Sequence, residues 1–80
     1  MKSWSVNYKG HTIRVECHTG GEMRLLVDGE LQDTEFSLYY TRLNGIIRSG
    51  DGAGEEIKVA LCRRLFVRSC RIFVDHRLAE

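Results

Sequence analysis

Cysteine and histidine are the side chains of this sequence that could bind a metal ion or serve as a nucleophile and a base. Six are present: Cys17, Cys62, Cys70, His11, His18 and His76. Neither a C-x-x-C nor an H-x-x-x-H spacing occurs, and the adjacent Cys17 and His18 would point to opposite faces of a strand. The sequence therefore predicts no metal site and no cofactor.

A catalytic cysteine is the next possibility. Cys62 is followed by Arg63 and Arg64, which could lower the pKa of its thiol. Such a nucleophile also needs a base and an oxyanion site, and the base would have to be His76, in a predicted turn. The stretch "GDGAGEE" lacks the Lys-Ser/Thr of a phosphate-binding loop. We expect a protein that is not an enzyme, with cysteines that act as small buried hydrophobic residues.

The basic segment 62–73 raises the possibility of nucleic-acid binding. Its arginines are interleaved with Phe66 and Phe73, and such side chains can contact phosphates and stack on bases. A net charge of only +1 gives little long-range attraction for a polyanion, so nucleic acid is the less favoured partner. The arginines could equally be solvated or pair with the acidic segment 22–35. Single-stranded nucleic-acid binding is retained as the alternative function, with four candidate residues: Arg63, Arg64, Phe66 and Arg68.

The elements that would position these residues are strands. Apolar residues alternate with polar ones in period two, as in "TIRVEC", and no proline interrupts the runs. The glycines fall at turn-like intervals, with Asp28-Gly29 and Asn44-Gly45 predicted as hairpin turns and 49–54 as a flexible loop. The run "EFSLYY" predicts a further strand over 35–40. These patterns predict one all-β domain over 1–80, a small antiparallel β-sandwich of about seven or eight strands.

A pseudo-repeat organises these strands. "RLLVDGEL" at 24–31 resembles "RIFVDHRL" at 71–78, and each is preceded by a similar strand, "IRV" or "IKV". Two such copies could pack face to face, because each leaves one apolar face to cover. The predicted inward residues are Ile13, Val15, Leu25, Val27, Ile57, Val59, Ile72 and Val74.

The same alternation leaves Leu26 and Phe73 pointing outward at equivalent positions of the two copies. Equivalent apolar exposure indicates a shared partner surface, with Arg24 and Arg71 on the same face. We therefore expect a protein-binding or self-association module of otherwise unknown function. The simplest form of self-association is a homodimer, because twofold pairing is the commonest assembly.

A family resemblance accompanies these motifs. The stretch "IRVECHTGGEMRLLVDGE" and the later "EIKVAL" and "CRIFVD" resemble a lobe of the Fas apoptotic inhibitory molecule family. The resemblance implies a compact antiparallel β-sandwich that binds protein and has no catalytic residue. The second turn here is Asp75-His76, where the family pattern has glycine.

Membrane and export signals are the last features to consider. No apolar run approaches the roughly 18 residues that would span a bilayer. The stretch "MKSWSVNYKG" has no apolar core of the kind found in signal peptides. The sequence thus predicts no membrane association and a cytoplasmic location with reduced thiols.

Overall fold

A computed structural model describes the backbone of residues 2–18, 20–36, 40–63 and 68–79, and their side chains except those of 62, 63 and 68. Within these ranges the chain forms strands, which confirms the predicted all-β antiparallel fold. No helix in the described ranges is long and apolar enough to cross a membrane. The strands are β1 (Lys2–Tyr8), β2 (His11–Cys17), β3 (Glu22–Val27), β4 (Glu30–Phe36), β5 (Tyr40–Ile46), β6 (Glu56–Arg63), β7 (Arg68–Val74) and β8 (Arg77–Leu78).

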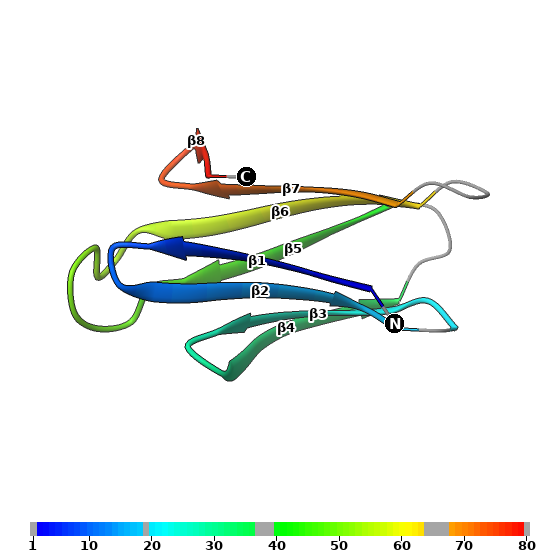
Figure 1. Ribbon diagram of the computed structural model, residues 1–80, viewed down its shortest axis with the longest axis horizontal. Helices are drawn as coiled ribbons and strands as arrows, with labels where there is room; N and C mark the ends of the chain where they lie inside the picture. Colours follow the sequence, from blue (N-terminus) through cyan, green and yellow to red (C-terminus); the bar gives the residue numbers. More distant parts are fainter. Residues whose placement is uncertain (1, 19, 37–39, 64–67, 80) are drawn as a thin grey trace.

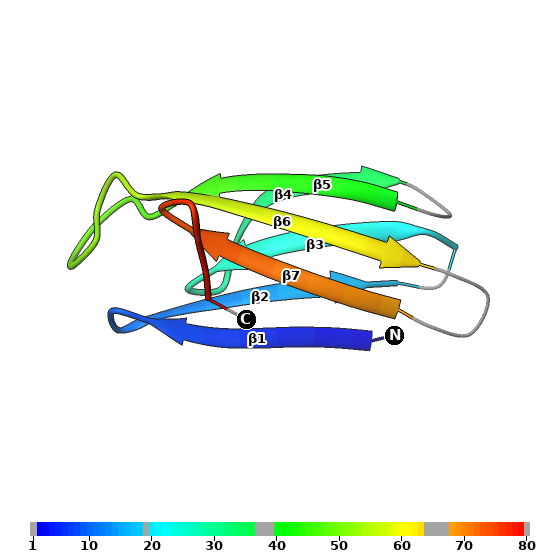
Figure 2. The same ribbon diagram turned by 90° about the horizontal axis from the view of Figure 1, so that it is seen from above.

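The strands form two four-stranded sheets. Sheet A has the order β1-β2-β3-β4 and sheet B the order β5-β6-β7-β8, so each strand pairs with its neighbour in sequence. All these pairings are antiparallel. The connections β1–β2, β3–β4, β5–β6 and β7–β8 therefore lie at one end of the molecule, on the left in Figure 1 and Figure 2.

The core lies between the two sheets. Every second described side chain of β2, β3 and β6 is buried, as period-two alternation requires when one face of a sheet is covered. All eight predicted inward residues belong to this core, and Trp4, Val6 and Tyr8 of β1 pack against it. The remaining core members are Cys17, Met23, Leu43, Ile47 and Leu61.

The pseudo-repeat is visible in the strand pairing. Asp28 and Gly29 have φ angles of 52° and 81°, and Asp75 and His76 have 51° and 62°. Both turns thus have two successive residues in the left-handed region, as a two-residue type I′ hairpin requires. The cross-strand partners also correspond: Ile13 with Val27 and Val15 with Leu25 in sheet A, Ile57 with Val74 and Val59 with Ile72 in sheet B.

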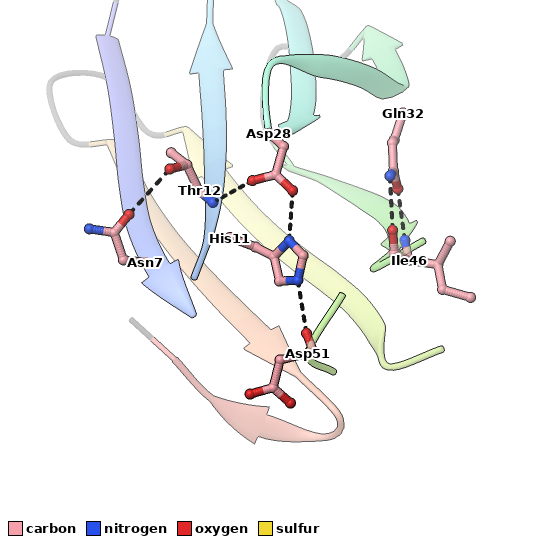
Figure 3. Close-up of polar contacts among 7 residues, drawn as sticks. All are labelled: Asn7, His11, Thr12, Asp28, Gln32, Ile46 and Asp51. Carbon is pink, nitrogen blue, oxygen red and sulfur yellow. Dashed lines mark hydrogen bonds and ion pairs between the residues drawn. The ribbon is translucent and has the colours of Figure 1, made fainter. Parts of the chain in front are cut away.

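The predicted turn at Asn44-Gly45 is wrong, because both residues lie inside β5. Gly45 serves a different purpose from a turn glycine. A Cβ at Gly45 would lie 2.6 Å from Gln32 Oε1 and 2.9 Å from Leu25 Cδ2. Gln32 approaches this strand from β4, accepting a 2.7 Å hydrogen bond from Ile46 N–H and donating a 2.8 Å bond to Ile46 C=O (Figure 3). Glycine at 45 therefore lets the edges of the two sheets meet.

The predicted strand over 35–40 is also wrong. Strand β4 ends at Phe36 and belongs to sheet A, whereas β5 begins at Tyr40 and belongs to sheet B. Phe36 and Tyr40, two members of the predicted strand, therefore belong to strands of different sheets. Leu38 and Tyr39 lie outside the described residues. Alternation alone does not show whether two apolar residues belong to the same strand, which is why the run was misread.

The loop that was predicted to be flexible has a hydrogen-bonded structure. Ile47 C=O accepts a 2.7 Å bond from Gly54 N–H, and Gly52 C=O accepts a 3.0 Å bond from Glu55 N–H. Positive φ angles at Gly50, Gly52 and Gly54 allow the chain to turn repeatedly within this short span. The glycines thus build a compact loop between β5 and β6.

Candidate binding face

The most enzyme-like pair in the described residues is His11 with Asp28. His11 begins β2, Asp28 lies in the β3–β4 turn, and Asp51 lies in the β5–β6 loop. His11 Nδ1 is 2.6 Å from Asp28 Oδ2, and His11 Nε2 is 2.8 Å from the Asp51 carbonyl oxygen (Figure 3). Asp28 Oδ1 also accepts a 2.9 Å bond from Thr12 N–H. His11 thus connects three segments that are distant in sequence.

Both ring nitrogens of His11 face acceptors, a carboxylate and a carbonyl. Only the protonated imidazolium can donate to both. The hydrogen bond to Asp28 and then the one to Asp51 C=O raise the pKa of His11 above 6.5. The hydrogen bonds from His11 and then from Thr12 N–H lower the pKa of Asp28 below 3.8. His11 is only 8% exposed and both of its nitrogens are engaged, so it holds the loop and is not placed as a general base.

Glu55 holds the other side of the same loop. Its Oε1 accepts hydrogen bonds from Tyr8 O–H at 3.1 Å and from Lys9 Nζ at 3.2 Å. The bond to Glu55 raises the pKa of Lys9 above 10.5. Because Gly52 has no side chain, the Glu55 carboxylate can lie against its backbone. These contacts hold the loop against Tyr8 and Lys9.

The outer face of sheet B has a different character. We use this name for the side chains of β5, β6 and β7 that point away from the core. Strand register arranges most of them in three rows across the sheet, and Ile46 and Glu56 form a further outward pair where β5 ends and β6 begins. The rows are Tyr40 and Ser69, on either side of position 62, whose side chain lies outside the described residues; Arg42, Ala60 and Arg71; and Asn44, Lys58 and Phe73.

A groove of about 370 Å³ lies on this face. Its side-chain walls are Tyr40, Arg42, Asn44, Lys58 and Phe73, with Ala60 between them. Tyr40 is 50% exposed. The Arg42 guanidinium lies 5.7 Å from the Tyr40 ring centroid, and its Nε donates a 2.7 Å bond to the Tyr40 hydroxyl. The groove thus combines aromatic surface with hydrogen-bond donors.

The charge of this groove is positive. Arg42 and Lys58 line it, and Arg71 is exposed beside Ala60. The acidic side chain that reaches Lys58 is Glu56, at a separation of 4.0 Å in a solvent-exposed setting. Such a pair is weak, because water screens exposed charges. The face therefore favours an anionic or aromatic ligand.

The outer face of sheet A, formed by the side chains of β1 to β4 that point away from the core, neutralises its own charges. Glu16 Oε2 is 2.9 Å from Arg14 Nε, and Glu16 Oε1 is 2.9 Å from His18 Nε2. The hydrogen bonds from His18 and then from Arg14 lower the pKa of Glu16 below 4.5. Arg24 forms an ion pair with Glu22 on the same face. Sheet A thus presents few unpaired cations to a ligand.

The four residues of the predicted interface do not share one surface. Leu26 and Arg24 lie on the outer face of sheet A, whereas Phe73 and Arg71 lie on the outer face of sheet B. The expectation of a shared patch is therefore corrected. Copies that pack core to core in a sandwich necessarily direct their equivalent outward residues in opposite directions.

The alternative nucleic-acid residues fall at the β6–β7 connection. Arg63 ends β6 and is paired in register with Arg68, which begins β7. Their side chains, and Arg64 and Phe66 entirely, lie outside what the structure describes. The groove residues Tyr40, Arg42, Asn44, Lys58 and Ala60 were missed. Alternation in "YTRLN" indicates the first three, but it was obscured when Asn44-Gly45 was interpreted as a turn.

Neither metal-binding clusters nor known proteins suggest another site. Over the described ranges, no group of three or more His, Cys, Asp or Glu side chains is placed to hold a metal ion. The resemblance to the Fas apoptotic inhibitory molecule family stays a prediction. In comparisons with known proteins, the chain matches no family model, no curated protein and no solved structure.

Proposed function

We propose that this chain is a non-enzymatic binding module that takes its ligand on the outer face of sheet B. The observation that carries the proposal is the groove of about 370 Å³, which is lined by Tyr40, Phe73, Arg42 and Lys58. Ligand sites are typically concave, with apolar walls and a few convergent polar groups. This groove has that composition, and the outer face of sheet A has its charges paired.

A binding role also agrees with the His11 pair. A histidine general base needs one ring nitrogen within reach of the reacting proton. In this protein Asp28 and the Asp51 carbonyl occupy both nitrogens. The polar pair that most resembles a catalytic dyad therefore stabilises a loop.

Amide chemical shifts would test the location of the binding face. Uniformly ¹⁵N-labelled protein is titrated separately with a thymidine decamer, a polyglutamate peptide and inorganic pyrophosphate. We expect at least one of them to shift the amides of Arg42, Lys58 and Phe73 while those of Arg14 and Arg24 stay unchanged. Shifts confined to sheet A, or the absence of shifts with all three at millimolar concentration, would contradict the proposal.

Self-association is a second candidate, favoured by an apolar pair on sheet A. Leu31 is 52% exposed and is paired in register with Leu26. Burying a leucine against a partner is worth roughly 1.5–3 kcal/mol. Sedimentation velocity at high micromolar concentration should then show a dimer in wild type and a monomer in Leu31→Lys. A wild-type protein that sediments as a monomer would remove this candidate.

A further inference from the structure

We infer that the ligand of the outer face of sheet B is a single-stranded nucleic acid, an inference that rests on the proposed function above. Its basis is the arrangement of aromatic and cationic side chains across three strands. Tyr40 and Phe73 lie at opposite corners of the three-row array. Arg42 and Arg71 flank Ala60 in the row between them.

The spacing of the two aromatic residues suits a strand with separated bases. They lie four residues apart along the sheet and two strands apart across it. With a rise of about 3.3 Å per residue and strands about 4.8 Å apart, their Cα atoms are roughly 16 Å from one another. A single strand crossing this diagonal could stack a base near each ring. The Arg42 guanidinium lies over the Tyr40 ring and is itself a planar cation on which a base can stack.

The charge of the two halves of the chain supports an anionic ligand on this side. Residues 1–39, which include sheet A, carry four Lys or Arg and six Asp or Glu. Residues 40–80, which include sheet B, carry eight Lys or Arg and five Asp or Glu. The overall charge of +1 thus conceals an acidic half and a basic half. The excess of cations over acidic residues thus lies in the half of the chain that contains the groove.

The aromatic walls favour unpaired bases over other anions. An acidic peptide or a free phosphate would use the cations but would gain little from Tyr40 and Phe73. A duplex keeps its bases stacked inside the helix, so they could not stack on these rings. Sheet faces that carry exposed aromatic and basic side chains are recurrent platforms for unstacked bases. The whole arrangement therefore suits a single strand best.

The pseudo-repeat supplies a matched set of variants. Aligning Ile13 with Ile57 places Glu16 of sheet A at the position of Ala60 in sheet B. The substitution Ala60→Glu would place a carboxylate in the groove, at the position that Glu16 occupies beside Arg14 in sheet A. Phe73→Ala removes a stacking surface, and Leu26→Ala is the same truncation at the equivalent position of sheet A.

The test is fluorescence anisotropy with a labelled thymidine decamer. Wild type should bind with a log-log salt slope of about −2, as expected for roughly three neutralised phosphates. Phe73→Ala should weaken binding about 10-fold or more, because each stacked base contributes substantially to affinity. Ala60→Glu should abolish binding, and Leu26→Ala should leave it unchanged. Circular dichroism checks that each variant keeps its strands.

The outcomes separate this inference from the proposed function. Equal affinity for a duplex decamer would overturn the inference, because stacking would then play no part. If the protein binds polyglutamate but not the decamer, and Ala60→Glu abolishes the polyglutamate binding, the inference of a nucleic-acid ligand would be overturned. The proposed binding face on sheet B would still be supported. Decamer binding that survives Ala60→Glu would overturn both proposals. A wild-type protein that binds no decamer at low salt would also overturn the inference.

Discussion

The outer faces of the two sheets are built on the same strand register but carry opposite chemistry. Arg14 of sheet A and Lys58 of sheet B occupy equivalent positions, yet Arg14 is bound by Glu16, where sheet B has Ala60. Arg14 on sheet A is therefore held at 2.9 Å by Glu16, whereas Lys58 on sheet B is paired with the more distant Glu56, at 4.0 Å. The repeat specifies the scaffold, whereas single outward residues decide how the charges on each face are paired.

The largest losses of stability should come from substitutions at core positions where the two sheets are alike. Leu25 and Ile72 are equivalent and both are fully buried. Leu25→Ala and Ile72→Ala should each lower the free energy of unfolding by about 2–5 kcal/mol, because each leaves a cavity in the shared core. Urea denaturation measures both losses. Ser5→Ala, at an exposed position, is the control and should change the free energy of unfolding by about zero. A large loss for one and none for the other would show that the sheets do not share one core.

An intermediate effect should arise where the sheets differ at an inward position. Gly45 of β5 corresponds to Val6 of β1, because Ile57 and Ile13 are their respective partners. Gly45→Ala should cost about 1–3 kcal/mol, since the new Cβ would collide with Gln32 and Leu25. The loss should shrink in a Gln32→Ala background, because one of the colliding side chains is gone. An equal loss in both backgrounds would contradict the proposed role of Gln32.

The His11 pair predicts a pH dependence for one turn and not for its equivalent. The pKa of His11 is raised, so its contribution to stability is present below about pH 6.5 and is lost as pH rises through the folded value. The pKa of Asp28 is lowered, so its contribution is present above about pH 3.8 and is lost as pH falls. His11→Gln should therefore lower the free energy of unfolding most between about pH 3.8 and pH 6.5, and less at pH 8.

Proton NMR of the imidazole would measure the His11 pKa directly. It should lie above 6.5 in wild type and fall toward that value in Asp28→Asn. Asp75→Asn, at the equivalent turn of sheet B, should leave it unchanged. Titration of wild-type His11 at or below its ordinary value would show that Asp28 does not hold the ring protonated.

The smallest effects should come from the second residue of each hairpin turn. His76 has a φ of 62° and Gly29 has a φ of 81°, a region that side chains with a Cβ rarely adopt. His76→Gly should stabilise the protein by about 0.5–1 kcal/mol, and Gly29→Ala should destabilise it by a similar amount. Urea midpoints would detect both changes. A stabilising Gly29→Ala would contradict the turn geometry.

Sequence reasoning succeeded where a property depends on near neighbours. Period-two alternation identified Ile13, Val15, Ile72 and Val74 as inward residues, and Asp28-Gly29 was recognised as a turn. It failed at Gly45, where the same kind of dipeptide lies inside a strand. The deciding contact there is Gln32, on the other sheet, and nothing adjacent to Gly45 in the chain reveals it.

The candidate site shows the same limit. The sequence indicated that Phe73 and Arg71 point outward, and the structure places them so. It did not indicate that Tyr40 and Arg42 lie on the same sheet face as Phe73. That relation depends on β5 pairing with β6 and on β6 pairing with β7. The link from His11 to Asp51, across 40 residues, was equally invisible.

By itself the amino-acid order determined most of the strands and their inward faces and the repeated hairpin, because alternation and turn chemistry act over a few residues. Only the tertiary structure decided that Leu26 and Phe73 point away from each other, because two sheets that bury their inner faces together must expose their outer faces on opposite sides. It also decided that Arg42, Lys58 and Phe73 line one groove, because strand pairing joins residues that lie far apart in sequence.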